Sequence, residues 1–209
     1  MLQLILFTLF TALLATVAHA AASNTAGAVI YIRDAAFANR GKSSINLLKN
    51  TQILVGDHIV TGHNTRVVLR MIDGAVLTLG EDTEFTINNY SYSKNEQQGS
   101  ATLELVKGVF RAVTGAIGKL KERDFKVKTT LGLIGIRGTD FWGGYYFSDA
   151  LDVALLGGAG IFVENAAGRV EVSSIGNGTT LNSTSEPPSP PKLWGAKKLN
   201  AAKLSVSLN

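Results

Sequence analysis

Histidine and carboxylate side chains are the first candidates for chemistry in this chain, and their spacing argues against it. His58 and His63 lie five positions apart across a predicted turn. Two imidazoles can begin a metal site, but no third histidine or carboxylate stands at ligand spacing in the sequence. Glu81, Asp82 and Glu84 follow a glycine, where a solvated loop is expected rather than a general acid and base. We therefore predict no metal site and no catalytic residue.

Nucleophile and cofactor motifs give no support for an enzyme either. The chain has no cysteine, which removes thiolate ligands, a cysteine nucleophile and disulfides together. The glycine-rich run at Gly157–Gly160 lacks the G-x-G-x-x-G order and the following helix of a phosphate loop. No G-x-S-x-G elbow occurs. The sequence therefore predicts no cofactor and places an enzyme behind a binding module.

The most distinctive stretch surrounds Arg137, which stands among apolar residues. Its guanidinium is expected to be partly desolvated and to need an acceptor, with Asp140 near in sequence and Asp57 near in space. We predict a buried, structural arginine. The alternative is an exposed, anion-binding arginine framed by Gly135 and Gly138, whose missing Cβ atoms let a ligand approach closely.

Three aromatic residues, Trp142, Tyr145 and Trp194, are candidates for contact with a partner. An aromatic platform that would suit a carbohydrate ligand could include Tyr90, Tyr92, Trp142, Tyr145 and Tyr146. Strand alternation weakens that platform, because the three aromatic residues at 142, 145 and 146 cannot all share one face of a regular strand.

Short β-prone segments from Ala28 to about Leu181 must position these residues. Apolar residues alternate from Thr65 to Met71 and again from Ala75 to Leu79, and the Asp73-Gly74 dipeptide between them is typical of a hairpin turn. Similar segments recur along the chain at 101–105, 125–129, 151–156, 161–163 and 170–172. We predict an all-β domain of about a dozen short strands, as a twisted β-sandwich or a short β-solenoid-like domain.

The first residues are predicted to be an export signal. An apolar run from Leu4 to Val17 ends in Ala18-His19-Ala20, the small-x-small pattern of a signal peptidase site. The run is shorter than the roughly 20 residues that a spanning helix needs. We expect cleavage near Ala21 and a periplasmic or secreted chain without a membrane span.

The predicted organisation has four parts. Residues 1–20 form the signal peptide and residues 21–182 the all-β domain. All four prolines lie in the Pro/Ser-rich segment 183–191, which is expected to be an extended linker. Residues 192–209 form a basic tail that could be a short helix, ordered only if something packs against it. The net charge of +4 is spread along the chain rather than gathered in one run, so nucleic-acid binding is not expected.

The order of four segments resembles the FecR-type domain. These segments are Val55–Gly62, Asp73-Gly74, Leu105–Gly108 and Gly135–Phe141, and the resemblance spans about Ala28 to Val163. FecR-type domains are periplasmic, all-β modules of iron-dicitrate sensors, which relay receptor occupancy to a sigma factor. The resemblance brings no catalytic residues. It assigns structural roles to Asp57, Gly62, Gly135, Arg137, Gly138, Thr139 and Asp140.

The resemblance implies a stand-alone, exported version of this domain, since a full sensor would add an anti-sigma segment, a spanning helix and a receptor-contacting subdomain. Our leading hypothesis is a non-enzymatic binding or signalling module. Its partner would be another envelope protein, such as a receptor, secretion or signalling component. The alternative is a module that binds a carbohydrate or peptidoglycan, and the partner would then be an envelope polysaccharide.

Overall fold

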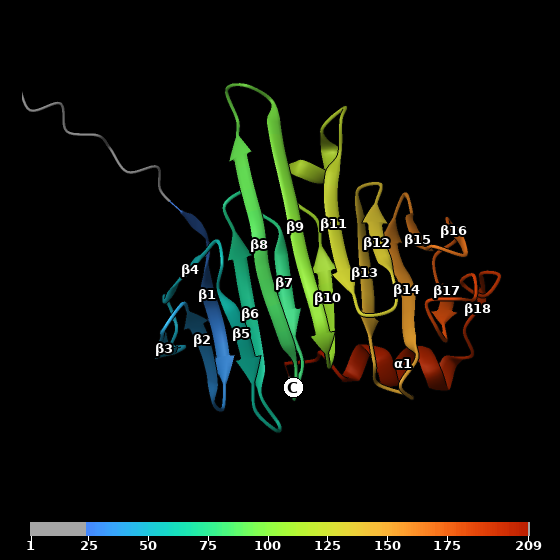
Figure 1. The fold of residues 1–209 in the computed structure, drawn as a ribbon, viewed down its shortest axis with the longest axis horizontal. Helices are drawn as coiled ribbons and strands as arrows, with labels where there is room; N and C mark the ends of the chain where they lie inside the picture. Colours follow the sequence, from blue (N-terminus) through green and yellow to red (C-terminus); the bar gives the residue numbers. More distant parts are fainter. Residues whose placement is uncertain (1–23, 209) are drawn as a thin grey trace, which may run out of the picture.

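The computed structural model describes residues 24–208, and strands make up most of it (Figure 1). The predicted leader at 1–20 lies outside the described residues. Eighteen strands, one 3-10 helix and one α-helix follow one another in this range. They are β1 (Thr25–Arg33), β2 (Ala36–Arg40), β3 (Ser43–Asn46), β4 (Gln52–Leu54), β5 (His58–Thr61), β6 (Arg66–Met71), β7 (Val76–Leu79), β8 (Glu84–Ser93), β9 (Gln98–Lys107), β10 (Val109–Val113), η1 (Ile117–Lys119), β11 (Asp124–Thr129), β12 (Leu133–Ile136), β13 (Thr139–Gly144), β14 (Leu151–Gly158), β15 (Ile161–Asn165), β16 (Gly168–Val172), β17 (Asn177–Leu181), β18 (Lys192–Leu193) and α1 (Ala196–Leu204).

The strands form two nine-stranded sheets. Sheet A has the order β18-β17-β14-β13-β10-β7-β6-β1-β4, and sheet B has the order β16-β15-β12-β11-β9-β8-β5-β2-β3. From β6 onward the chain mostly gives two strands to one sheet and then crosses to the other. The two sheets therefore grow together along the chain, in the manner of a sandwich wound like a short solenoid.

Period-two patterning explains why these segments become strands with one buried face. In β6 the side chains of Val67, Leu69 and Met71 point into the core, and β7 pairs with β6 in antiparallel register. Between these strands Gly74 adopts a φ of 84°, which a side chain would disfavour. The predicted hairpin through the Asp73-Gly74 turn is confirmed.

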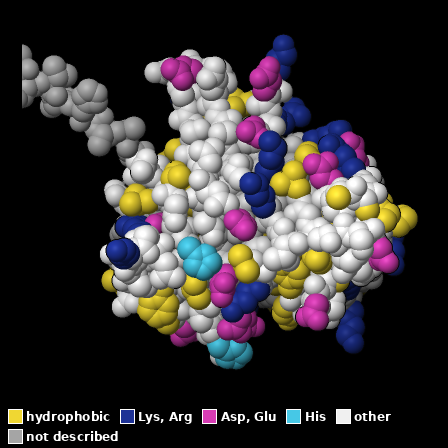
Figure 2. Space-filling model, viewed as in Figure 1, with side chains coloured by type: hydrophobic (Ala, Val, Ile, Leu, Met, Phe, Trp, Pro, Cys, Tyr) yellow, Lys and Arg dark blue, Asp and Glu magenta, His cyan; other side chains and the backbone are white. Residues whose placement is uncertain are grey.

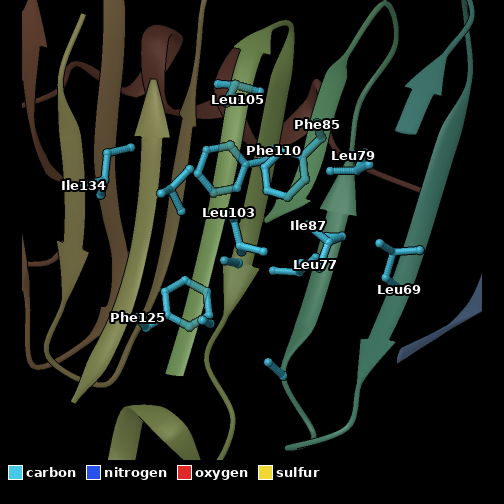
Figure 3. Packing of buried hydrophobic residues seen from close by; sticks show 14 of the residues in the cluster. Leu69, Leu77, Leu79, Phe85, Ile87, Leu103, Leu105, Phe110, Phe125 and Ile134 are labelled. Carbon is cyan, nitrogen blue, oxygen red and sulfur yellow. The ribbon is translucent and has the colours of Figure 1, made fainter. Parts of the chain in front are cut away.

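The core lies between the two sheets (Figure 3). Phe110 of sheet A is central, because its ring centroid lies 5.4 Å from that of Phe85 in sheet B and 5.4 Å from that of Phe141 in its own sheet. Leu77 and Leu103 face this cluster from opposite sheets and are fully buried. Each such side chain contributes about 1.5 to 3 kcal/mol through burial.

The C-terminal tail, residues 192–208, covers part of the outer face of sheet A. Its helix α1 packs there and makes a second, smaller apolar cluster. This cluster contains Val109, Trp142, Ala154, Trp194, Ala202 and Val206. Strand alternation alone would leave the sheet residues of this cluster facing water, so the tail accounts for their burial.

The predicted all-β class is confirmed, and so is a short helix in the tail. The structure has more strands than the dozen expected, because strands such as β3, β4 and β18 have only two to four residues and are too short to show a pattern of alternation. Among residues 24–208, no helix is long and apolar enough to cross a membrane.

Candidate interaction site

Asp57 is a structural residue of the turn between β4 and β5. Its carboxylate is fully buried and receives two hydrogen bonds from Arg40, at 2.7 and 2.9 Å, and one from the backbone N–H of Leu54 at 2.9 Å. The hydrogen bond and the charge of Asp57 raise the pKa of Arg40. Through the N–H of Leu54 the carboxylate holds the backbone of the β4–β5 turn. The expected pairing with Arg137 is wrong, because Arg40 takes that place.

Gly62 ends the same segment, directly after β5. Its N–H donates to the carbonyl of Ala35 at 3.0 Å, and a Cβ atom on Gly62 would lie 3.3 Å from that oxygen. Beside it, the hydroxyl of Thr61 donates to Gly80 at 2.7 Å and accepts from the N–H of Thr83. The segment therefore joins the β2, β5 and β8 regions at one end of the sandwich.

The predicted structural motif around Arg137 makes the crossing from sheet B to sheet A. Gly135 in β12 lies under the ring of Phe162, where a Cβ atom would come within 2.0 Å of the ring. Gly138 has a φ of 73° at the crossing itself. In β13 the N–H of Thr139 donates to the hydroxyl of Thr114 at 2.8 Å. These contacts set the path of the backbone between the sheets.

Arg137 itself is not buried, so the prediction of a desolvated arginine is wrong. Its side chain is 51% exposed and pairs with Glu171 at 2.7 Å on the outer face of sheet B. The cause is register: Arg137 follows the buried Ile136 and so points outward. Asp140 does not receive it either, because Asp140 accepts two hydrogen bonds from Arg111, at 2.8 and 2.7 Å.

Two of the three aromatic candidates for partner contact are covered by the chain itself. Trp142 is fully buried and Trp194 is 5% exposed, with their rings 6.0 Å apart. The indole N–H of Trp142 donates to the hydroxyl of Ser205 in the tail at 3.0 Å. Tyr145 is half-buried and its hydroxyl lies 2.7 Å from that of Thr130. In this structure neither tryptophan is available to a partner.

A charged contact also fixes the tail. Asp152 is almost fully buried on the outer face of β14, and the ammonium group of Lys198 in α1 donates to it at 2.7 Å. The same ammonium group lies 4.3 Å from the ring centroid of Trp194, which adds a cation–π contact. The tail is therefore held by apolar packing, a hydrogen bond and an ion pair together.

Among residues 24–208, His58 and His63 lie in different surroundings. The Nδ1 atom of His58 is 2.9 Å from the hydroxyl of Thr86. His63 lies beside Glu81 and Asp82, and the ligand atoms of these three residues are within 4.8 Å of one another. The sequence had suggested no carboxylate near His63, and the fold brings two. His63 is 75% exposed, so this is an open, solvated group rather than an enclosed site.

Asp73 holds together three segments at the opposite end of the sandwich. Its carboxylate accepts hydrogen bonds from the hydroxyl of Tyr90 at 2.7 Å and from the N–H groups of Ala75 at 3.0 Å and Ile117 at 3.1 Å. Burial, and then the charge of Asp73, raise the pKa of Tyr90. The 3-10 helix η1 is thereby tied to the β6–β7 turn and to β8.

A cleft lies between η1 and the distal part of the β8–β9 hairpin. We call residues 88–99 the arm and this space the arm cleft; its volume is about 790 Å³. Figure 1 shows the arm rising beyond its neighbours. The cleft is lined by hydroxyl, amide, ammonium and carboxylate groups together with Tyr92 and Leu120. Its lining is Ser91, Tyr92, Ser93, Glu96, Gln97, Gln98, Gly99, Ser100, Lys119, Leu120, Lys121, Glu122 and Asp124.

The outer face of sheet B is polar (Figure 2). Uncharged polar groups and backbone cover much of this face. Lys119, Lys121 and Glu122 are exposed at the cleft and none takes part in an ion pair found among the described residues. A second cleft, of about 380 Å³, lies at the other end and is bordered by Tyr145, Tyr146 and Ser205 among others. The arm cleft is the larger and offers more charged groups to a ligand.

Sequence reasoning missed most residues that build these sites. Arg40 and Asp57 are 17 residues apart, and Tyr90 and Asp73 are also 17 apart, so no local pattern links them. The one available signal was the Asp73-Gly74 dipeptide, which predicted the turn but not the role of its carboxylate. The arm cleft is formed by two segments, neither of which carries a chemical motif.

This geometry defines the class of the protein. It is an all-β domain of two sheets, the chain alternates between them, and the domain has a polar cleft. Its family follows from comparison with known proteins: the chain carries a FecR-type domain, because the model of the family described as FecR protein matches residues 57–159. That range includes Asp57, the arm and the crossing at Gly138. Comparison with curated proteins gave no match.

Two solved structures have a similar fold. Both are described as a proposed anti-sigma factor from Parabacteroides distasonis, at 2.50 and 1.65 Å resolution. The first is 17% identical with a TM-score of 0.54, over 69% of this chain and 62% of that chain. The second is 18% identical with a TM-score of 0.53, over 69% and 63%. The chain thus spans less than two thirds of these proteins, and the likeness is one of fold.

Proposed function

We propose that this chain is an exported, non-enzymatic FecR-type module that regulates or signals by binding another protein of the cell envelope at the arm cleft. The FecR-type domain and the anti-sigma description of the structural relatives support a regulatory role. The apolar run and the Ala18-His19-Ala20 pattern support export.

The observation that carries the proposal is the make-up of the arm cleft. Its walls present Lys119, Lys121, Glu96 and Glu122 beside several hydroxyl and amide groups. No histidine or cysteine is among the residues that line it, so its surface suits hydrogen bonding and charge pairing better than proton transfer. Charged groups at a rim guide a protein partner and select among partners.

The cleft also has one fixed wall. The hydrogen bond from the N–H of Ile117 to Asp73 anchors η1, and the neighbouring Gly118 is buried. A partner that enters the cleft would meet a preorganised surface on this side, which lowers the cost of binding.

Site-directed photo-cross-linking tests the proposed site. A photoreactive residue at Gln98, inside the cleft, should capture an envelope protein in living cells, and one at Lys203 on α1 should not. Replacing both Lys119 and Lys121 by Glu should lower capture at Gln98 at least about tenfold, since two rim charges are reversed.

The matched control replaces Lys197 and Lys203, two exposed lysines of α1, by Glu, which changes the net charge equally. Equal capture by the two double variants would refute the arm cleft as the contact site. Export is tested separately by measuring the intact mass of the exported chain. The mass should be that of a chain that begins at Ala21 or within two residues of it. A mass that includes Met1 would rule out cleavage.

A further inference from the structure

The arm has a second side, the outer edge of β8. Along this edge β8 pairs with β5 only as far as Thr86, and Ile87 then exchanges backbone hydrogen bonds with Gly56 and Asp57. From Asn88 to Ser93, β8 pairs only with β9. Within the described residues the outer backbone edge of this stretch therefore has no strand partner. Figure 1 shows this part of β8 extending beyond β5.

This free edge differs from the terminal strands of the two sheets, which are either very short or charged, and both features oppose pairing with another chain. At one end of the sandwich, β3 has four residues and β4 has three. At the other end, β16 contains Arg169 and Glu171, and β18 begins with Lys192. The free stretch of β8 has the sequence Asn-Asn-Tyr-Ser-Tyr-Ser, with neither a charge nor a proline. It is thus longer than the uncharged terminal strands β3 and β4, and unlike β16 it carries no charge.

Side-chain directions fix how this edge could pair with itself. Tyr90 is buried and Tyr92 is half-buried on the inner face, whereas Asn89 and Ser91 are exposed on the outer face. Opposed residues of an antiparallel pair lie on the same face of the sheet. In a symmetric antiparallel pair, the two-fold axis must therefore lie where a residue is opposite the same residue of the second copy.

We propose that the outer edge of β8 pairs antiparallel with the same edge of a second copy of this chain, about a two-fold axis at Ser91. In this register Ser91 faces Ser91 of the second copy, Asn89 faces its Ser93, and Tyr90 faces its Tyr92. Sheet B would continue from one copy into the other with its inner face on the same side. The proposal does not rest on the proposed function.

A second copy fits this edge better than a foreign strand for two reasons. The edge carries no charge that could select a particular partner sequence, and no like charges face each other in the symmetric register. A two-fold pairing uses the same edge on both copies, and two-fold symmetry is the commonest symmetry of soluble oligomers. Because the edge from Asn88 to Ser93 is short, the contact is small and the dimer is reversible.

Sedimentation measurements on the purified chain test this pairing. The mean mass should rise from that of one chain toward that of two between roughly 10 µM and 1 mM. Ser91→Lys places two ammonium groups opposite each other and should weaken association at least about tenfold, and Ser91→Glu should do the same. An equimolar mixture of the two variants should regain association, because the opposed charges then attract.

The matched control is Thr102→Lys, which adds the same charge to the outer face of β9, where both backbone edges are paired. It should associate like the unaltered chain. Hydrogen exchange at residues 88–93 should slow as the concentration rises. A chain that stays monomeric to 1 mM overturns the proposal, as does a mixture of the Lys and Glu variants that stays dissociated, or a dimer whose slowed amides lie outside this stretch.

Discussion

The outer faces of the two sheets follow the same strand alternation but differ in what covers them. On sheet A the outward residues Trp142 and Ala154 are buried, because the C-terminal tail packs over them. On sheet B the outward residues Thr86, Thr102 and Lys126 stay partly exposed. Alternation determines which side chains point outward, but a distant segment determines whether they reach water.

This difference bears on function. The tail occupies much of the outer face of sheet A near β13 and β14, so a partner would have to displace it to bind there. The outer face of sheet B and the arm are not covered by the tail, and the arm cleft lies beside the arm. The expected role of Trp142 and Trp194 in partner binding is therefore replaced by a role in closing sheet A.

Removal of the tail should have the largest effect on the difference between the outer faces of the two sheets. Deletion of residues 192–209 would expose Trp142, Val109 and Ala154, and should lower the free energy of unfolding by on the order of 4 kcal/mol, as loss of a buried tryptophan contact does. Urea denaturation measures the loss, and a dye that binds apolar surfaces should bind the truncated chain. An unchanged midpoint without dye binding would contradict the packing described above.

Two aspartate–arginine pairs allow a buried ion pair to be compared with a more exposed one. Asp57→Ala removes a fully buried carboxylate from Arg40 and should cost about 2 to 3 kcal/mol. Asp140→Ala breaks the more exposed pair with Arg111 and should cost about 1 kcal/mol or less. Thermal melting of both variants gives the comparison, and equal losses would show that burial does not set these energies.

Tyr90 tests the buried end of the arm. Tyr90→Phe removes a hydrogen bond to the buried Asp73 and should cost about 1 to 2 kcal/mol. Burial raises the pKa of Tyr90 in the folded state. The protonated hydroxyl therefore contributes its full share to the free energy of unfolding below the unfolded pKa of about 10, and this contribution is lost as the pH rises above that value. Unfolding measured from pH 9 to 11 should therefore show a steeper loss for the unaltered chain than for Tyr90→Phe. Parallel curves would argue against the raised pKa.

Arg137 should show the smallest effect, although it stands in the most distinctive sequence segment. Arg137→Ala removes an exposed pair with Glu171 and should change the free energy of unfolding by no more than about 0.5 kcal/mol. Gly135→Ala is the informative counterpart, since its Cβ atom would collide with the ring of Phe162. A melting temperature lowered more by Arg137→Ala than by Gly135→Ala would reverse these assignments.

The sequence predicted features that depend on local patterns. The strands at β6 and β7 and the turn at Gly74 follow from alternation and from one dipeptide. The exposure of Arg137 could not be predicted, because the direction of its side chain depends on the register of β12 and not on the apolar character of its neighbours. The partners of Asp57 and Trp142 lie 17 and 63 residues away, so only the folded chain identifies Arg40 and Ser205.

The site shows the same limit. Lys119 and Lys121 give an unremarkable charged segment in the sequence, and Gln98 lies in a polar hairpin. Their meeting at the arm cleft requires that Asp73 anchor Ile117 beside the arm, which is a contact across 44 residues. Because the cleft is built from two such segments, its residues have no characteristic spacing that could be recognised in the sequence.

Tryptophan fluorescence of the intact chain is the most direct test of the central claim, that the tail closes sheet A and leaves sheet B and the arm open. The chain has two tryptophans, Trp142 and Trp194, and both lie in the cluster beneath the tail. We expect emission at shorter wavelength than that of tryptophan in water, with weak quenching by acrylamide. Emission like that of free tryptophan, with strong quenching in the folded chain, would show that the tail does not cover this face.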